Sequence, residues 1–277
     1  MFLYIGGEKP LQTSKRNALL LPTTVLKGLL AGGLAGFAAG LLGVSPGGIL
    51  VPIISLTLGF PQHLAQAVSL VCQAPPTSAS AFSSYFRKGH SVRLATVCIV
   101  SAGFVVGGPI GATFTNRFSD RELRWTYVGY LILLATLAIA RGLRAKQDHE
   151  EARTDGRLQW PWLALIGLIA GISSGLLGIG GGLAITALSI LLLRIGQHQA
   201  QALSLVVTAL PLTLPAAWMY VHQGARLPWL AILTIVIGLL IGTALGASLA
   251  NRLPERTLRI VFIGVILGMA TYMGFSA

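Results

Sequence analysis

The sequence has few charged residues, few acids and almost no cysteine. Charged residues make up only 10% of its 277 positions, and just eight residues are Asp or Glu. Hydrophobic residues make up 54% and the mean hydropathy is +0.75, which is typical of membrane proteins and outside the range of soluble domains. The two cysteines, Cys72 and Cys98, form no Cys-x-x-Cys pair. They indicate no zinc site and say nothing about the redox compartment.

Acidic residues are missing from the apolar segments, because all eight lie in expected loops or turns. Proton- and cation-coupled carriers usually place a carboxylate at membrane depth. No His-Glu-x-x-His motif is present either, and the strand-to-helix turn of a Gly-x-Ser-x-Gly nucleophile elbow is not expected in these apolar runs. We therefore expect no enzyme, no cofactor and no metal. Transport would be passive, or coupled to protons only through His63 and His198, for which helix capping or an interfacial position is the alternative role.

Long apolar runs fill most of the chain. Residues 163–177 and 227–249 contain no acid or base and, with their neighbours, are long enough to cross a hydrocarbon core of about 30 Å. The first half holds five such segments, at residues 25–44, 49–60, 63–86, 92–114 and 125–140. The second of these is too short to span at a rise of 1.5 Å per residue. The sequence predicts an all-α polytopic membrane protein with broken or re-entrant helices.

The formal net charge of +12 comes from Lys and Arg that cluster between the apolar runs. This placement favours anchoring to phospholipid head groups over binding of nucleic acid. A basic surface also raises the local concentration of an anionic solute. Under the expected topology, 12 of the 20 basic residues lie on the side of the central linker, which favours a cytoplasmic linker. No cleaved signal peptide is expected before the first long run.

The second half of the chain repeats the first at an offset of 135 residues. Matching pairs include Gly36 with Gly171, Gly40 with Gly175, Gln62 with Gln197, His63 with His198, Ser69 with Ser204, Pro76 with Pro211 and Arg124 with Arg259. Polar residues do not coincide at one offset by chance, so we interpret the pattern as an internal repeat, as in many secondary transporters. We expect a polar, basic and weakly structured lead-in at 1–24, a first repeat at 25–142, a linker at 143–160 and a second repeat at 161–277. Each half has an odd number of segments, which predicts an inverted repeat.

Glycine-rich stretches interrupt the first apolar run of each half. Gly175–Gly182 holds five glycines in eight residues, and Gly40–Gly48 is a weaker copy. Glycine disfavours a continuous helix by about 1 kcal/mol per residue, and a helix that begins after a break presents free N–H groups that attract anions. The candidate anion contacts are Gly43, Ser45, Gly47, Gly48, Gly178, Gly180, Gly181 and Gly182. The alternative is that these glycines only allow close helix packing.

A polar helix face follows each break. Gln66, Ser69 and Gln73 share one face because they are spaced by three and four residues, and Gln201, Ser204 and Thr208 repeat that face. Neutral donors of this kind suit a desolvated oxyanion, because they bind it without adding a trapping charge. These six residues are therefore candidate substrate contacts. Hydrogen bonding between helices is the alternative role.

The doubled pattern resembles the sulfite exporter TauE/SafE family, the 4-toluene sulfonate uptake permease group. The resemblance rests on Gly40-Leu-Leu-Gly43 with Gly47-Gly48-Ile-Leu-Val-Pro52, and on Gly175–Gly182, and it covers about residues 25–277. The chain departs from the pattern at Ser45-Pro46 and at Ala187. The resemblance implies a bacterial or archaeal inner-membrane transporter of small sulfur-containing or carboxylated anions, such as sulfite, sulfonates or sulfoacetate.

These observations favour a carrier that moves a small oxyanion by alternating access at the two glycine breaks. An anion channel of the same architecture and a non-transporting membrane assembly factor are the alternatives. The expected partners are a small anionic substrate and the lipid bilayer, and the architecture is compatible with a homo-oligomer.

Overall fold

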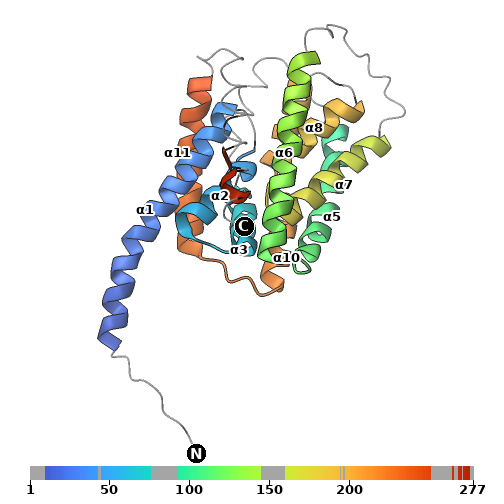
Figure 1. Ribbon diagram of the computed structural model, residues 1–277. Coiled ribbons are helices and arrows are strands. Elements are labelled where there is room, and N and C mark those ends of the chain that lie inside the picture. Colours follow the sequence, from blue (N-terminus) through green and yellow to red (C-terminus); the bar gives the residue numbers. More distant parts are fainter. Residues whose placement is uncertain are drawn as a thin grey trace, which may run out of the picture.

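The computed structural model is helical wherever it describes regular structure (Figure 1). It describes residues 10–42, 45–75, 93–144, 160–193, 195, 197–250, 264, 268–269 and 271–274. Some helical positions within these ranges, His198 and Gln201 among them, have side chains that lie outside the description. The helices are α1 (Pro10–Leu42), α2 (Gly47–Leu58), α3 (Gln62–Cys72), α5 (Leu94–Thr115), α6 (Asp120–Arg144), α7 (Trp160–Leu177), α8 (Gly182–Leu193), α9 (Gln197–Ala209), α10 (Leu214–His222) and α11 (Trp229–Ala250).

Several of these helices are membrane-spanning by length and composition. Four apolar stretches are long enough to cross, namely Pro22–Leu41, Leu94–Thr115, Trp160–Leu177 and Trp229–Leu249. The bent pair α9–α10 gives a fifth candidate, with an angle of 49° at the break that contains Pro211. Because no strand occurs among the described residues, the prediction of an all-α polytopic membrane protein is confirmed for that part of the chain.

Two pairs of long parallel helices frame the molecule, α1 with α11 and α5 with α7. Glycine lets the backbones of each pair touch. A Cβ on Gly36 would overlap the backbone of Leu239, and one on Gly171 would overlap the backbone of Phe104. Small residues at such positions are what allow close helix packing in lipid. Gly36 and Gly171 are related by the 135-residue offset, so equivalent glycines allow the close backbone contact in both helix pairs.

The helix bounds themselves repeat at this offset. α2 and α8 are both 12 residues long, and α5 and α11 are both 22 residues long, with each pair of starting residues 135 apart. The short segment expected at 49–60 is observed as α2. The segment expected at 63–86 begins as α3 but leaves helical geometry after Cys72, and residues 76–92 lie outside the described part. The inverted relation of the two halves stays a prediction.

The N-terminal part differs from the expectation. We expected a weakly structured lead-in through residue 24, whereas α1 is helical from Pro10 onward. Gln, Lys, Arg, Ala and Leu are good helix formers, and a proline is tolerated at a helix start because its missing N–H has no intrahelical acceptor to lose. The apolar segment that begins near Val25 is therefore the continuation of a longer helix.

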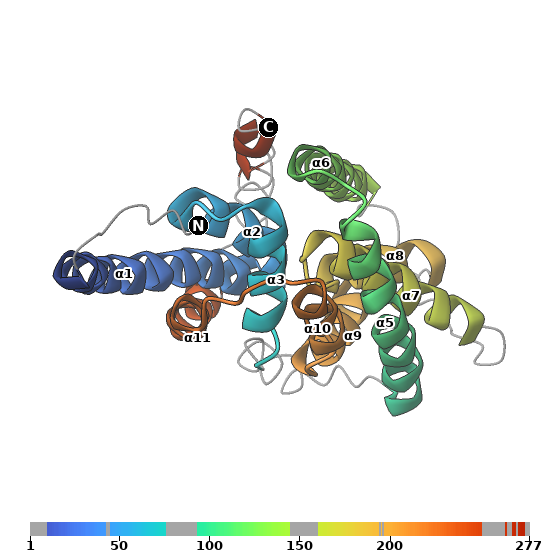
Figure 2. The same cartoon turned by 90° about the horizontal axis from the view of Figure 1, so that it is seen from below.

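α3 lies between two groups of helices. Seen from below, α1, α2 and α11 stand on one side and α5, α7 and α8 on the other (Figure 2). α3 contacts α2 and α11 from the first group, α7 from the second, and also α10. Its position makes it the element best placed to join the two groups.

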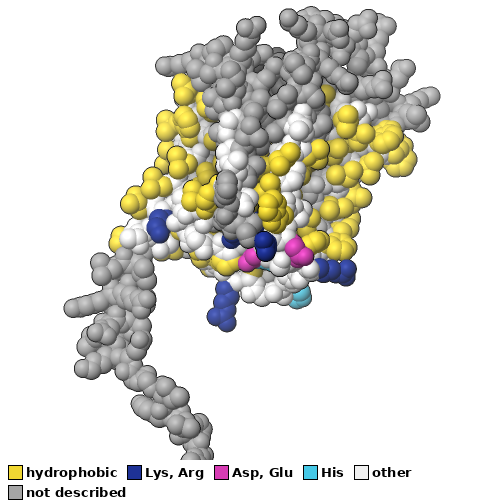
Figure 3. Space-filling view, viewed as in Figure 1, with side chains coloured by type: hydrophobic (Ala, Val, Ile, Leu, Met, Phe, Trp, Pro, Cys, Tyr) yellow, Lys and Arg dark blue, Asp and Glu magenta, His cyan; other side chains and the backbone are white. Residues whose placement is uncertain are grey.

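The outer surface is that of a protein in lipid. Hydrophobic side chains cover the flanks in Figure 3, while Lys, Arg, Asp, Glu and His gather along the lower edge. Large apolar side chains such as Leu34, Trp160 and Leu245 are more than half exposed. Exposed apolar surface on this scale is costly in water, and a bilayer removes that cost. We call the lower edge in Figure 3 the charged end.

Candidate functional site

The two interruptions expected from the sequence lie against each other inside the molecule. We call Ser45–Gly48 together with Gly178–Gly182 the glycine junction, and all of its residues are buried. A Cβ on Gly182 would lie 2.7 Å from the Ser45 Cβ, and one on Gly47 would overlap the Ile179 carbonyl. Gly43 lies outside the described residues. The structure therefore brings together seven of the eight candidate positions that the sequence analysis named in the interruptions.

The second interruption requires glycine for its backbone. Gly178, Gly180 and Gly181 have φ values of 70°, 79° and 71°, a region that residues with a Cβ rarely adopt. Gly180 also has no space for a side chain, because its Cβ would overlap the Gln73 amide oxygen. The same backbone ends α7 at Leu177 and starts α8 at Gly182.

α3 is hydrogen-bonded to this second interruption. Ser69 Oγ donates to the Gly178 carbonyl at 2.7 Å, and Gln73 Nε2 donates to the same oxygen at 3.2 Å. Ser45 Oγ of the first interruption donates to Gln73 Oε1 at 3.0 Å. Gln73 thus joins both interruptions, and a helix of the first half carries the polar contacts of the second half's break.

Gln66 is fully buried and only partly hydrogen-bonded. Its Oε1 accepts a hydrogen bond from the Tyr220 hydroxyl at 3.0 Å, whereas no partner of Nε2 is found among the described residues. The Tyr220 oxygen also lies 2.8 Å from the Gly175 carbonyl and 3.1 Å from Thr115 Oγ1. Buried amide groups are normally paired, so the free donor of Gln66 is available for a ligand or water.

The corresponding face of α9 bonds to its own half. Ser204 Oγ donates to the Gly182 carbonyl at 2.7 Å, and Thr208 Oγ1 donates to the Ser204 carbonyl at 2.8 Å. A Cβ on Gly182 would lie within 3.3 Å of both side chains. Ser204 and Thr208 therefore border the glycine junction, while the side chain of Gln201 lies outside the described residues.

The predicted pair of histidines is not part of the junction as far as the structure describes it. His63 Nδ1 lies 2.7 Å from Asp120 Oδ1, and its Nε2 lies 3.1 Å from the Thr115 carbonyl. The His63 backbone N–H donates to the same carboxylate oxygen at 3.2 Å, so Asp120 caps the start of α3. Both ring partners are hydrogen-bond acceptors. The side chain of His198 lies outside the described residues.

Two tyrosines that the sequence analysis did not select also hold the site. Tyr220 joins α10 to α3, α5 and α7, as described above, and Tyr127 of α6 donates to the Gly48 carbonyl at 3.0 Å. Tyr127 and Tyr220 are both buried. The repeat gave one usable signal, because Tyr85 matches Tyr220 at the 135-residue offset. Nothing comparable marked Tyr127, whose counterpart is Phe262.

The electrostatics of the junction favour an anion. α2 begins at Gly47 and α8 begins at Gly182, so two helix N-termini meet there. The first turn of a helix has N–H groups without intrahelical acceptors and carries the positive end of the helix dipole. The side chains that border it, Ser45, Ser69 and Gln73, are neutral. Among the described residues no group of three His, Cys, Asp or Glu could hold a metal ion.

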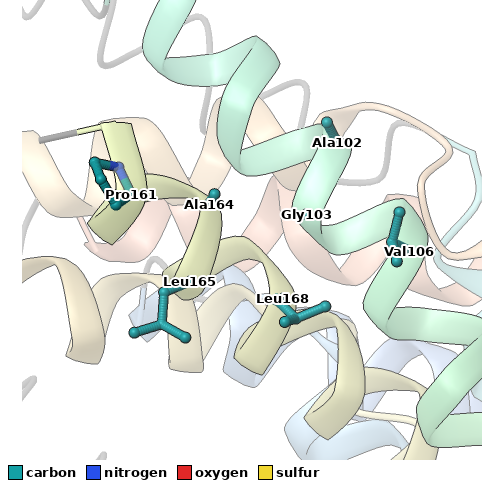
Figure 4. Close-up of a pocket in the computed structure, with 7 residues that line it drawn as sticks. All are labelled: Ala102, Gly103, Val106, Pro161, Ala164, Leu165 and Leu168. Carbon is teal, nitrogen blue, oxygen red and sulfur yellow. The ribbon is translucent and has the colours of Figure 1, made fainter.

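A separate hollow lies between α5 and α7 (Figure 4). It has a volume of about 450 Å³ and is open to the outside. Its lining residues are apolar, with Val106 from α5 and Pro161 and Leu165 from α7 among them. None of the predicted site residues lines it, and an anion would lose its hydration there without gaining a donor. The glycine junction is therefore the better candidate site.

Comparison with known proteins gives a family match over most of the chain. The family model described as sulfite exporter TauE/SafE matches residues 28–273. The chain belongs to this family. A "Probable membrane transporter protein YdhB" of Bacillus subtilis (strain 168) is 25% identical over 227 residues, which cover 82% of this chain and 90% of the relative. A "Probable membrane transporter protein" of Xylella fastidiosa (strain 9a5c) is 26% identical over 249 residues, covering 88% and 92%. No solved structure matches significantly.

Membership of the TauE/SafE family confirms the resemblance drawn from the two glycine-rich interruptions. The matched region begins at Gly28 in α1 and includes both interruptions and all the described helices that follow. The chain is thus a membrane transporter of the TauE/SafE family, and its environment is the lipid bilayer.

Proposed function

We propose that this TauE/SafE protein carries a small sulfur-containing oxyanion, such as sulfite, a sulfonate or sulfoacetate, through the glycine junction. The main observation in support is that the N-termini of α2 and α8 meet at a buried site bordered by neutral polar side chains. Backbone N–H groups and the helix dipoles would bind the oxyanion there, as they bind anions at other helix starts. The absence of positive side chains at the described junction suits release, because no fixed charge would trap the ion.

The two halves would act as an inverted repeat that exposes the junction to each side in turn. The helix bounds that recur at 135 residues support this proposal. So do the directions of the helix pairs, since α1 and α11 rise from the charged end in Figure 1 while α5 and α7 descend toward it. In transporters with this symmetry, one repeat rocks against the other around a fixed site. The relatives from bacteria favour a bacterial inner membrane, and the distribution of basic residues favours a cytoplasmic linker.

The test is uptake of labelled sulfite into proteoliposomes, in competition with sulfate, sulfoacetate, taurine and acetate. We expect saturable uptake that is strongly reduced in Gly181→Leu, Gln73→Ala and Gln201→Ala. Leu165→Ala in the hollow between α5 and α7 is the matched control and should transport normally. The pattern of competitors would name the anion class.

The alternatives predict other results in the same experiment. Uptake that rises linearly with concentration would favour an anion channel. Absence of flux for every anion tested, in a protein that elutes as a folded species, would favour an assembly factor and contradict the proposal. If uptake is saturable but unaffected by the junction variants, the substrate site lies elsewhere.

A further inference from the structure

A column of polar side chains runs along one face of α3. Gln62, Gln66, Ser69 and Gln73 follow at spacings of four, three and four residues, and none is more than 4% exposed. At a rise of 1.5 Å per residue the column is about 16 Å long. It begins beside His63 and Asp120 at the charged end and finishes at the glycine junction, where Ser69 and Gln73 bond to Gly178.

The outer half of this column is poorly satisfied. Neither amide atom of Gln62 has a partner among the described residues, nor does Gln66 Nε2. Gln223, at the end of α10, also has a buried Oε1 without a partner. Apolar side chains would serve better if this region only held helices together, because unpaired buried amides destabilise a fold. Unpaired amides in a line are what a polar solute or water would need on its way through.

Two neighbouring helices pack small side chains against α3. α5 and α10 present Ala112, Ala216 and Ala217 toward α3, and these small residues form one cluster with Ala67 and Leu70. Because these side chains are small, a modest movement of α10 would open a path between the helices. α10 is also joined to α9 through the bend of 49°, which provides a place where that movement can occur.

The Tyr220 hydroxyl is a buried polar tie between α10 and its neighbours. It reaches Gln66 on α3, Gly175 on α7 and Thr115 on α5. The phenol has one proton, so at any moment it donates either to Gln66 Oε1 or to the Gly175 carbonyl. Loss of the hydroxyl would remove the polar contacts of Tyr220 with three helices, while the ring would keep its packing.

We propose that the α3 column is the passage between the glycine junction and the charged end, and that the Tyr220 hydroxyl keeps it closed. This inference rests on the proposed function, since it supplies the route to the same site. Ser69 and Gln73 bond to the junction at the inner end, and Gln62 receives the anion at the outer end. The α9 residues Gln197, Gln201, Ser204 and Thr208 repeat the column in sequence, which would give the opposite side a passage of its own.

The test measures access of an anionic reagent to single cysteines. Native Cys72 and Cys98 are replaced by alanine, and Gln62→Cys or Gln66→Cys is introduced, with Tyr220 intact or as Tyr220→Phe. Labelling by a membrane-impermeant sulfonate-bearing methanethiosulfonate is followed by mass spectrometry in proteoliposomes. Loss of one bridging hydroxyl should speed labelling of both positions by about two- to ten-fold. Val68→Cys, which is equally buried on the opposite face of α3, should stay unlabelled throughout.

The outcomes separate this inference from the proposed function. Faster labelling of Gln62→Cys and Gln66→Cys in Tyr220→Phe, with Val68→Cys unchanged, supports the passage. This holds even if sulfite neither protects the cysteines from labelling nor is transported. Equal labelling of all three positions would mean that Tyr220→Phe loosens the fold, and would overturn the inference. Unchanged labelling in Tyr220→Phe would overturn it as well, whatever the flux measurements show.

Discussion

Ser45–Gly48 and Gly178–Gly182 occupy equivalent places in the repeat, yet they are shaped by different chemistry. In the first, Pro46 has φ −65° and ψ −20°, which is ordinary right-handed geometry. In the second, Gly180 and Gly181 have φ values of 79° and 71°. The first interruption contributes a side chain, Ser45 Oγ, whereas the second contributes the Gly178 carbonyl and glycines that leave room for the side chains of other segments. Equivalence in sequence position does not carry over to equivalence in chemistry.

This difference assigns different tasks to the two halves. The second interruption accepts hydrogen bonds from α3 through Gly178, and its glycines leave room for Ser45 and Gln73. The first interruption is fixed by Pro46 and by Tyr127, which donates to the Gly48 carbonyl. A rigid side and a side that depends on glycine therefore face each other. Changes to the glycine-dependent side should have the larger effects.

The largest effect is expected for Gly180→Ala. The new Cβ would be held at positive φ, which disfavours it by about 1–2 kcal/mol, and would overlap the Gln73 amide, which adds about 1–3 kcal/mol. The free energy of unfolding should fall by about 2–5 kcal/mol, measured as loss of monodisperse protein in a detergent thermal series. Gly224→Ala is the matched control, since Gly224 also has positive φ but nothing within 4 Å of its Cβ position. Equal losses in the two variants would contradict the packing argument.

In a second pair of variants, the change in the first interruption should have the larger effect on stability. Gly47→Ala would meet the backbone of Ile179, whereas Gly182→Ala would meet the side chains of Ser45, Ser204 and Thr208. Because backbone yields less than side chains, we expect Gly47→Ala to destabilise by about 1–3 kcal/mol and Gly182→Ala by less. Adding Ser45→Gly should restore the stability of Gly182→Ala in the same thermal series, since it removes the Ser45 Cβ that clashes with the new Cβ. No restoration would mean that the two interruptions do not touch at this point.

Part of this arrangement was predictable from sequence and part was not. The glycine spacing and hydrophobic runs predicted α2 and α8, because chain breaks and apolar length are local properties. The polar face of α3 was also predicted, since helical periodicity places Gln66, Ser69 and Gln73 together. The hydrogen bonds from this face to the interruption of the other half were not predicted. Tyr220 and Gln66 are 154 residues apart, and periodicity within one helix does not say which partner it meets.

The comparison of Gln73 with Thr208 tests those hydrogen bonds. These residues are equivalent in the repeat, but Gln73 bonds to both interruptions while the Thr208 hydroxyl bonds within α9. Gln73→Ala would leave the Ser45 hydroxyl without its acceptor and remove one of the two donors to Gly178. We expect a loss of stability of about 1–2 kcal/mol and a raised KM for anion uptake. Thr208→Ala should change both by less, and a larger effect there would place the substrate in the second half alone.

The smallest effect is expected at the charged end, for His63→Ala. His63 and Asp120 are 32% and 45% exposed, and partly exposed ion pairs stabilise by only about 0–1 kcal/mol because water screens them. Asp120 caps α3 from outside the junction, so removal of the ring should leave the site intact. His63→Ala combined with His198→Ala should transport at the rate of the unmodified protein, with or without an imposed pH gradient in the uptake assay. A response to the gradient that the unmodified protein shows and the folded double variant loses would assign the histidines to proton coupling, with the coupling ion bound at the ends of the repeat and the anion at its centre.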